Sequence, residues 1–312
     1  MMLSTLEQAG VGRVLNRDCE FTSLSTDTRN ITPGQLFVAL VGDNFDAHTM
    51  LEKAQEKGAC ALVVMREMAI DLPQLIVADT TRALGAIGAV FRHAFIGKVV
   101  ALTGSSGKTT VKGMLHEVLS RAGGCVSTQG NYNNHIGVPL TLARLENNAA
   151  YAVVEAGTNH PGEIAYLSQL ISPDVAMLTS IMPAHIGHFG RLSAIAEEKA
   201  EIFTDAASTV VVNLDMPYLD VIAPKLNGKR VIGFSMNATQ GKALPFELQK
   251  VIAPTEIRTD ELGRVAFTVP LSSGVVDAQL AVFGRHNIAN ALAAVAAADS
   301  LGVAPEVIVE GL

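Results

Sequence analysis

Seven residues have the types and spacing to hold the phosphates of a nucleotide: Gly104, Ser105, Ser106, Gly107, Lys108, Thr109 and Thr110. Backbone N–H groups of a glycine-framed turn and of a helix N-terminus bind anionic oxygens. The ammonium of Lys108 adds a full charge, and the hydroxyl of Thr109 suits Mg²⁺. The general P-loop pattern has glycine at the position of Leu102, whereas this loop starts at Gly104. We therefore predict a shortened phosphate loop over residues 104–110.

Three further segments carry groups suited to a metal ion or a phosphate. Glu155 ends an apolar run, and a carboxylate at a strand end beside a phosphate loop can bind Mg²⁺; a plain surface carboxylate is an equal alternative. His185 and His188 follow the next strand, where a histidine ligates metal, contacts phosphate or is simply solvated. Lys199 stands among glutamates, and this pattern alone favours a lysine on a solvated helix face.

Two clusters of asparagine are also candidates for ligand binding. One contains Asn131, Asn133 and Asn134 between two glycines, and the tolerance of Asn and Gly for left-handed backbone explains much of it. The other places His286, Asn287 and Asn290 at the start of the last long helix. A helix N-cap requires only one such side chain, so this second cluster favours ligand binding.

Strands and helices alternate from residue 97 onward. We predict strands at 98–103, 150–155, 175–181, 209–213 and 230–233, and helices at 108–122, 161–170, 193–203 and 218–226. This order predicts a mostly parallel sheet flanked by helices, with ligands beyond the carboxyl ends of its strands. After residue 244 the period changes. Segments 246–252, 264–270 and 275–283 predict antiparallel ribbons, and a final helix is expected over 287–301.

The residues before position 97 predict a second, smaller α/β domain. Its expected elements are strands at 35–41, 60–64 and 75–77 and helices at 48–57 and 80–93. We place the boundary at residue 96, which gives an N-terminal domain over 1–96 and a central P-loop domain over 97–312. The fold class is therefore α/β.

Composition limits the classes of function. The 312 residues are 49% hydrophobic with a net charge of −7, which gives no basic footprint for nucleic acid. Three distant cysteines, with no CxxC pair, indicate a reducing compartment rather than a disulfide or zinc framework. Neither a signal peptide nor an 18-residue apolar stretch is visible. We expect a soluble, cytoplasmic protein with no membrane span.

Together these motifs resemble those of the Mur ligases. The family shares TGSSGKTT, the strand-end Glu155, AHIGHFG, EEKAEIF and GRHNIANALAA in this order and spacing. Its members use ATP to add amino acids to the UDP-muramoyl precursor of peptidoglycan. Three more segments, STDTRNITPGQLFVAL, GNYNNHIGVPLTLARL and VVEAGTNHPGEI, are similar to the member that adds D-alanyl-D-alanine to UDP-N-acetylmuramoyl-tripeptide.

The resemblance implies a role for each matching residue. Residues 104–110 would hold ATP, with Lys108 on the β- and γ-phosphates and Thr109 on Mg²⁺. Glu155 and His185 would serve the metal sites, and Lys199 matches the lysine that these ligases carbamylate. Asn287 and Asn290 would contact the adenosine. The residues implied at the UDP-sugar end are Ser25, Thr26, Asp27, Arg29, Asn131, Asn133 and Asn134.

The implied chemistry is amide formation through an acyl phosphate. Phosphoryl transfer from ATP activates the terminal carboxylate of the tripeptide, and the amine of D-alanyl-D-alanine then displaces phosphate. The Mur ligases also carry a C-terminal domain, whereas this sequence ends at Leu312. We expect a monomer that folds and binds ligands without ligating them on its own.

Other interpretations stay open. A different Mur ligase, adding a single amino acid, is the nearest alternative. Folylpolyglutamate synthases share the phosphate loop and the modified lysine, but the N-terminal STDTR segment argues against them. A non-catalytic nucleotide-binding module is a third possibility; the presence of Glu155, His185 and Lys199 disfavours it.

Overall fold

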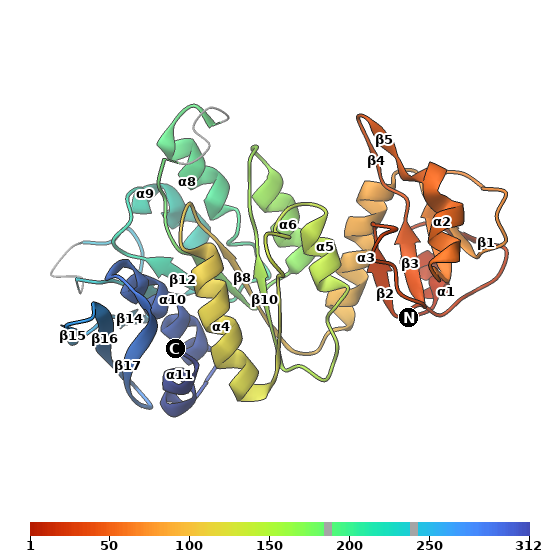
Figure 1. Cartoon of the computed structure of the whole chain (residues 1–312). Helices are drawn as coiled ribbons and strands as arrows, with labels where there is room; N and C mark the ends of the chain where they lie inside the picture. The colour runs from red at the N-terminus through yellow and green to blue at the C-terminus, as the bar shows by residue number, and fades with distance from the viewer. Residues whose placement is uncertain (184–188, 238–242) are drawn as a thin grey trace. The chain divides into compact units, whose positions relative to one another are not determined.

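The structure, a computed structural model, describes residues 1–183, 189–237 and 243–312. It divides into two compact units (Figure 1). The first contains residues 1–95 and 135–145, and the second contains 96–134 and 146–312. Residues 135–145 lie in sequence within the second predicted domain, yet they pack with the first unit. Each unit is described here by itself.

The first unit is built on a five-stranded sheet in the order β1-β7-β6-β3-β2. Within this sheet only the β1–β7 pair is antiparallel; β4 and β5 form a separate antiparallel pair. The elements are α1 (Leu3–Gln8), β1 (Arg13–Leu15), β2 (Ser23–Ser25), β3 (Gln35–Val38), β4 (Val41–Gly42), β5 (Phe45–Asp46), η1 (Ala47–Met50), α2 (Leu51–Glu56), β6 (Ala61–Val64), β7 (Gln74–Ile76), α3 (Thr80–Ala94) and α5 (Gly137–Leu142). Asp79 caps α3 through the N–H groups of Thr81 and Arg82. Gly88 of α3 lies so close to Pro139 of α5 that an added Cβ would come within 2.8 Å of the proline Cα.

The second unit contains the predicted parallel sheet. Its seven strands run in the order β14-β13-β12-β11-β8-β10-β9, and every neighbouring pair is parallel. The strands are β8 (Lys98–Thr103), β9 (Cys125–Ser127), β10 (Tyr151–Glu155), β11 (Val175–Leu178), β12 (Thr209–Asn213), β13 (Arg230–Phe234) and β14 (Lys250–Ile252). Because helices cover both faces, the central strands are continuous apolar runs, as in the fully buried residues 99–102.

The helices of the second unit pack against this sheet or against one another. They are α4 (Lys108–Gly123), α6 (Glu163–Ile171), α8 (Leu192–Ala200), α9 (Leu219–Ile222), η2 (Ala223–Leu226), α10 (His286–Ser300) and α11 (Pro305–Gly311). The predicted apolar stripe of α4 is buried and shares one core with α10 and α11, which lie beside it in Figure 1. The alanines of α10 allow this close approach, because their side chains add little bulk between the helix and the strands.

The region after residue 244 differs in part from the prediction. The segment 246–252 was expected in an antiparallel ribbon, but its last three residues form β14, which extends the parallel sheet beside β13. The antiparallel sheet consists instead of β15 (Glu256–Thr259), β16 (Arg264–Leu271) and β17 (Gly274–Phe283). A short apolar run looks the same in either kind of sheet, so its pairing depended on tertiary context. Within the described residues, we find no helix with the length and apolar character needed to cross a membrane.

Candidate nucleotide and metal site

The phosphate loop connects β8 to α4 at the carboxyl edge of the parallel sheet. Gly107 is the N-cap of α4 with φ 80°, and no side chain among the described residues caps this helix start. Its first N–H groups therefore remain available to an anion. A Cβ added to Gly107 would overlap Oδ1 of Asn290 on α10, so the loop also packs against the second asparagine cluster. In that cluster Asn290 donates to Asn287 Oδ1 at 2.9 Å, and Asn287 donates to the Phe283 carbonyl at 2.8 Å.

The loop is held in place by residues that follow β11. The N–H of Ser105 donates to the Ser180 carbonyl and the N–H of Ser106 donates to Ser180 Oγ, both at 2.9 Å. The hydroxyl of Thr179 donates to the Ser106 carbonyl at 2.7 Å, and a Cβ on Gly104 would overlap that hydroxyl. Sequence reasoning missed Thr179 and Ser180. Their position at the end of the strand beside β8 was the available signal.

Lys108 folds back over the loop. Its ammonium donates to the Gly104 carbonyl at 2.8 Å. Burial lowers the pKa of this ammonium, and attraction from Glu155 partly opposes the effect. Lys108 is thus a half-buried cation beside the N-terminus of α4, and an anion at this place would meet both the ammonium and the free N–H groups of the helix.

Glu155 is buried at the end of β10, with 2% of its surface exposed. One carboxylate oxygen, Oε1, accepts from Asn133 Nδ2 at 2.8 Å, while Oε2 accepts from Thr109 Oγ1 at 3.3 Å. The ammonium of Lys112 lies 3.3 Å from Oε2. Asn133 was assigned to the UDP-sugar end by the resemblance, but its side chain here contacts the carboxylate.

Lys112 was not identified from the sequence. It lies on α4, three residues after Thr109, and only 6% of it is exposed. Its ammonium also donates to the Gly130 carbonyl at 2.8 Å. The signal was helical spacing, because positions three and four apart share one side of a helix and this places Lys112 beside Lys108 and Thr109.

Lys199 lies on α8 with 4% of its surface exposed, so it is not the solvated lysine that its acidic neighbours suggested. Burial, followed by repulsion from Lys108, lowers its pKa to about 8; attraction from Glu198 opposes the shift. Among the described residues, no carboxylate forms an ion pair with this ammonium. The carboxylate of Glu198 is bonded elsewhere, because it accepts from the N–H groups of Gly162 at 2.7 Å and Ile164 at 2.8 Å.

The remaining predicted residues are distributed as follows. In the first unit, Arg29 forms an ion pair with Asp27 at 2.7 Å, which lowers the pKa of that carboxyl to about 2. Ser25 Oγ donates to the Asp27 carbonyl at 3.1 Å, and Thr26 is half-buried between them. Asn131 and Asn134 are exposed in the second unit. His185 and His188 lie outside the described residues.

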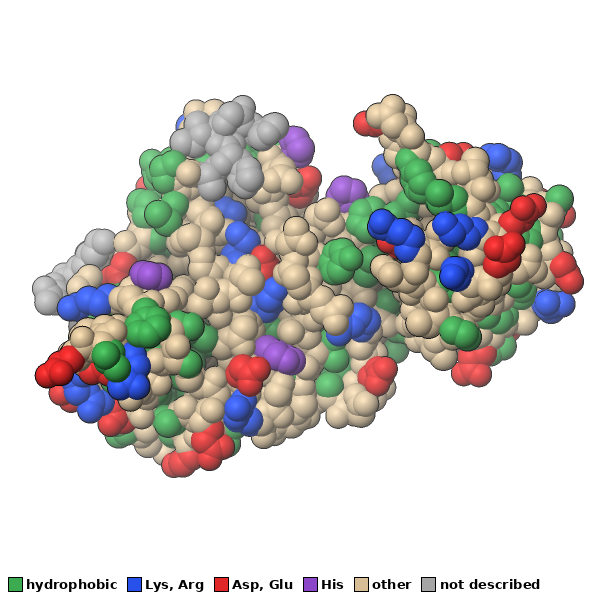
Figure 2. All heavy atoms as spheres, in the orientation of Figure 1, with side chains coloured by type: hydrophobic (Ala, Val, Ile, Leu, Met, Phe, Trp, Pro, Cys, Tyr) green, Lys and Arg blue, Asp and Glu red, His purple; other side chains and the backbone are tan. Residues whose placement is uncertain are grey.

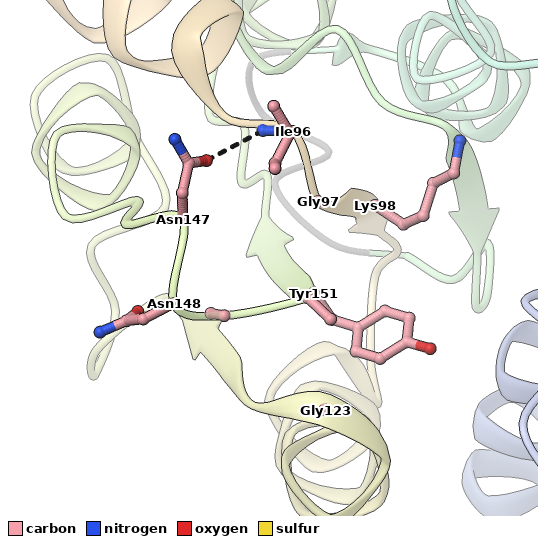
Figure 3. A pocket seen from close by; sticks show the side chains of 9 residues that line it. Ile96, Gly97, Lys98, Gly123, Asn147, Asn148 and Tyr151 are labelled. Atoms are coloured by element: carbon pink, nitrogen blue, oxygen red, sulfur yellow. Dashed lines mark hydrogen bonds between the residues drawn. The ribbon is translucent and has the colours of Figure 1, made fainter.

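On the face shown in Figure 2, both Lys and Arg side chains and Asp and Glu side chains are present. A cavity of about 440 Å³ lies at the amino ends of β8 and β10, where Asn147 accepts from the Ile96 N–H at 3.1 Å (Figure 3). The length of β8 separates this cavity from the phosphate loop, roughly 17 Å along an extended strand. It is therefore distinct from the candidate site.

A family model described as "Mur ligase middle domain" matches residues 102–298. The chain belongs to the Mur ligase family. It is 42% identical over 99% of its length to the UDP-N-acetylmuramoyl-tripeptide--D-alanyl-D-alanine ligase of Escherichia coli and covers 67% of that relative. A crystal structure of MurF from Acinetobacter baumannii superposes with a TM-score of 0.86 at 35% identity, over 99% of this chain and 67% of that one. MurF of Thermotoga maritima, solved with ADP, gives 0.76 at 25% identity, over 92% of this chain and 65% of that chain. The chain thus spans about two thirds of the length of these Mur ligases.

Proposed function

We propose that this chain is part of an ATP-dependent ligase that adds D-alanyl-D-alanine to UDP-N-acetylmuramoyl-tripeptide for peptidoglycan synthesis. The observation that supports this most strongly is the 42% identity, over 99% of the chain, to a relative of that name. A carboxylate does not react directly with an amine, because oxide and hydroxide are poor leaving groups. Transfer of the γ-phosphoryl group of ATP makes an acyl phosphate, which the dipeptide amine attacks with release of phosphate.

The side chains around Glu155 suit the cofactors that this reaction requires. Carboxylate and hydroxyl oxygens are hard ligands of the kind that Mg²⁺ prefers, and those of Glu155 and Thr109 lie 3.3 Å apart. Thr109, Glu155, His185 and modified Lys199 would hold the ion, which supplies positive charge beside the transferred phosphoryl group. Residues 104–110 would bind the phosphates, and Lys108 would neutralise their charge. Asn287 and Asn290 would contact the adenosine.

Lys199 is proposed to act as a carbamate. With a pKa of about 8, roughly a tenth of this amine is neutral at pH 7. The neutral nitrogen attacks CO₂, forming a C–N bond and releasing one proton, and the product is a carboxylate-like anion. Repulsion between Lys199 and Lys108 would then become attraction, and the site would gain an oxygen ligand.

The UDP-sugar end of the precursor is assigned to Ser25, Thr26, Asp27 and Arg29 with Asn131, Asn133 and Asn134. The amide of Asn133 already donates a hydrogen bond to the Glu155 carboxylate. A role in substrate binding therefore requires that this amide contact the substrate either in addition to Glu155 or in place of it. We further propose that the protein is a cytoplasmic monomer.

The test is a ligation assay on the whole protein that carries this chain. ATP and UDP-N-acetylmuramoyl-tripeptide are supplied with either D-alanyl-D-alanine or single amino acids, and ADP release and the new amide are measured. We expect turnover with the dipeptide and little with single amino acids. Turnover with a single amino acid would favour a different Mur ligase, and nucleotide binding without turnover would favour a non-catalytic module.

A further inference from the structure

The Lys112 ammonium occupies the position at which a counter-ion for Glu155 is needed. Two of the contacts to the Glu155 carboxylate come from neutral groups, Asn133 and Thr109, and the only full positive charge paired with it among the described residues is Lys112 at 3.3 Å. Both partners of the ion pair are buried, with side-chain exposures of 8% and 2%. A buried carboxylate without such a partner is strongly disfavoured, so the ion pair compensates the charge of Glu155 and fixes the position of its side chain.

The same ammonium fixes the loop that brings Asn133 to Glu155. Lys112 donates to the Gly130 carbonyl at 2.8 Å, and Asn133 lies three residues further along that loop. The N–H of Gly157, two residues after Glu155, donates to the Asn133 carbonyl at 2.8 Å. Lys112 therefore connects α4, the asparagine loop and the end of β10 without touching the phosphate loop itself.

We propose that Lys112 is a positioning residue that makes divalent-cation binding at Glu155 depend on the nucleotide. This rests on the proposed function of Glu155 as a metal ligand. A divalent cation on Oε2 would face an ammonium held 3.3 Å from that oxygen, and the two positive charges repel. Nucleotide phosphates beside Thr109 add the negative charge that offsets this repulsion. Cation and nucleotide therefore bind together, and the cation alone binds weakly.

The test measures binding of Mn²⁺ to this chain by the loss of its free-ion electron paramagnetic resonance signal, with and without ADP. Lys112→Met removes the charge and keeps most of the apolar stem. Lys112→Gln is the second neutral variant, which keeps a hydrogen-bond donor on a shorter side chain. Lys112→Arg keeps the charge, and Lys98→Met is the control at the opposite end of β8. Thermal unfolding shows that each variant is folded.

For the chain without substitutions we expect weak binding of Mn²⁺ alone and much tighter binding of Mn²⁺ when ADP is present. In both neutral variants Mn²⁺ alone should bind at least tenfold more tightly, so that the enhancement by ADP shrinks by the same factor. Lys112→Arg and Lys98→Met should behave as the unmodified chain. Adding Glu155→Gln to Lys112→Met should abolish the gain, which locates it at this carboxylate.

Unchanged or weaker Mn²⁺ binding in both neutral variants would overturn the role of Lys112. That result would leave the proposed function intact if ADP still binds and Lys108→Ala weakens it. Failure of the unmodified chain to bind ADP with Mn²⁺ would instead contradict the proposed nucleotide site.

Discussion

Glu155 and Lys199 are both buried charged residues of the second unit, but they differ in the charge of their neighbours: Glu155 lies beside a group of opposite charge, and Lys199 is repelled by one of the same charge. Glu155 accepts two side-chain hydrogen bonds and forms an ion pair with Lys112, so its charge is compensated as soon as the chain folds. Lys199 is buried to a similar extent, but the charge that affects it most among its neighbours is another cation, Lys108. Burial and repulsion lower its pKa to about 8.

The nearest acidic residue in sequence does not remove this imbalance. Glu198 directs its carboxylate to the N–H groups of Gly162 and Ile164, at the start of α6. In the folded chain, the charge of Glu155 is therefore compensated, whereas the charge of Lys199 has no ion-pair partner among the described residues. A buried lysine whose pKa is lowered to about 8 beside a second cation suits a modification that reverses its charge, which is the chemistry proposed for Lys199.

We expect the largest effect, a loss of ligation rate, when the uncompensated charge of Lys199 is removed. Lys199→Met should lower the rate of ligation by roughly 10²- to 10³-fold, as expected when a group that stabilises charge in the reaction is lost. The free energy of unfolding of the chain should stay within about 1 kcal/mol or rise, because the substitution removes a buried cation without a partner. Steady-state kinetics and urea unfolding measure the two quantities. Lys225→Met, at an exposed ion pair with Glu201, is the control. A large loss of stability in Lys199→Met would mean that Lys199 has a structural partner after all.

The compensated charge should respond in the opposite way. Glu155→Gln leaves the Lys112 ammonium buried without its partner, so the free energy of unfolding should fall by about 3 kcal/mol in urea titrations. Removing both charges in Lys112→Met with Glu155→Gln should recover most of this loss. Glu201→Gln breaks an exposed pair with Lys225 and should cost less than about 1 kcal/mol. Equal losses at Glu155 and Glu201 would refute the description of Glu155 as a buried, compensated carboxylate.

Stability should also depend on pH through Lys199. Its pKa is about 8 in the folded chain, against 10.5 for a lysine exposed to water, so between these values the unfolded chain binds more protons. The free energy of unfolding should therefore rise with pH over this window, by up to about 3 kcal/mol in CO₂-free buffer. The thiols of Cys60 and Cys125, whose pKa burial raises to about 12, act in the opposite direction. The difference between the unmodified chain and Lys199→Met cancels them, and parallel curves for the two proteins would exclude the effect.

Much of the second unit follows from local sequence pattern. The alternation of apolar runs and amphipathic segments predicted the parallel sheet and the phosphate loop at its carboxyl edge, because period and order determine that architecture. The prediction for segment 246–252 was wrong, since a three-residue strand carries no information about which neighbour it will pair with. Strands β9 and β15 were not predicted from the sequence, because strands of three and four residues show too little periodicity to be recognised.

The candidate site was less accessible to sequence reasoning, because burial of a charge depends on tertiary neighbours. Lys199 and Lys112 both look like solvated lysines in a polar helix, yet the structure buries both. Asn133 was predicted for the substrate, but its amide contacts Glu155, which lies 22 residues away. Only the family resemblance singled out Lys199, and nothing in the sequence singled out Lys112 beyond its helical spacing from Lys108.

The smallest predicted effect concerns the support of Lys199. Glu198→Ala removes the acceptor for two N–H groups at the start of α6, so the free energy of unfolding should fall by about 2 kcal/mol. Hydrogen exchange at Gly162 and Ile164 should accelerate, whereas Glu197→Ala, on the exposed side of α8, should change neither quantity measurably. Because attraction from Glu198 raises the pKa of Lys199, its loss should also move the pH window of the Lys199 effect downward. Faster exchange without that movement would show that Glu198 only caps α6, and movement without faster exchange would show that it is the counter-ion of Lys199.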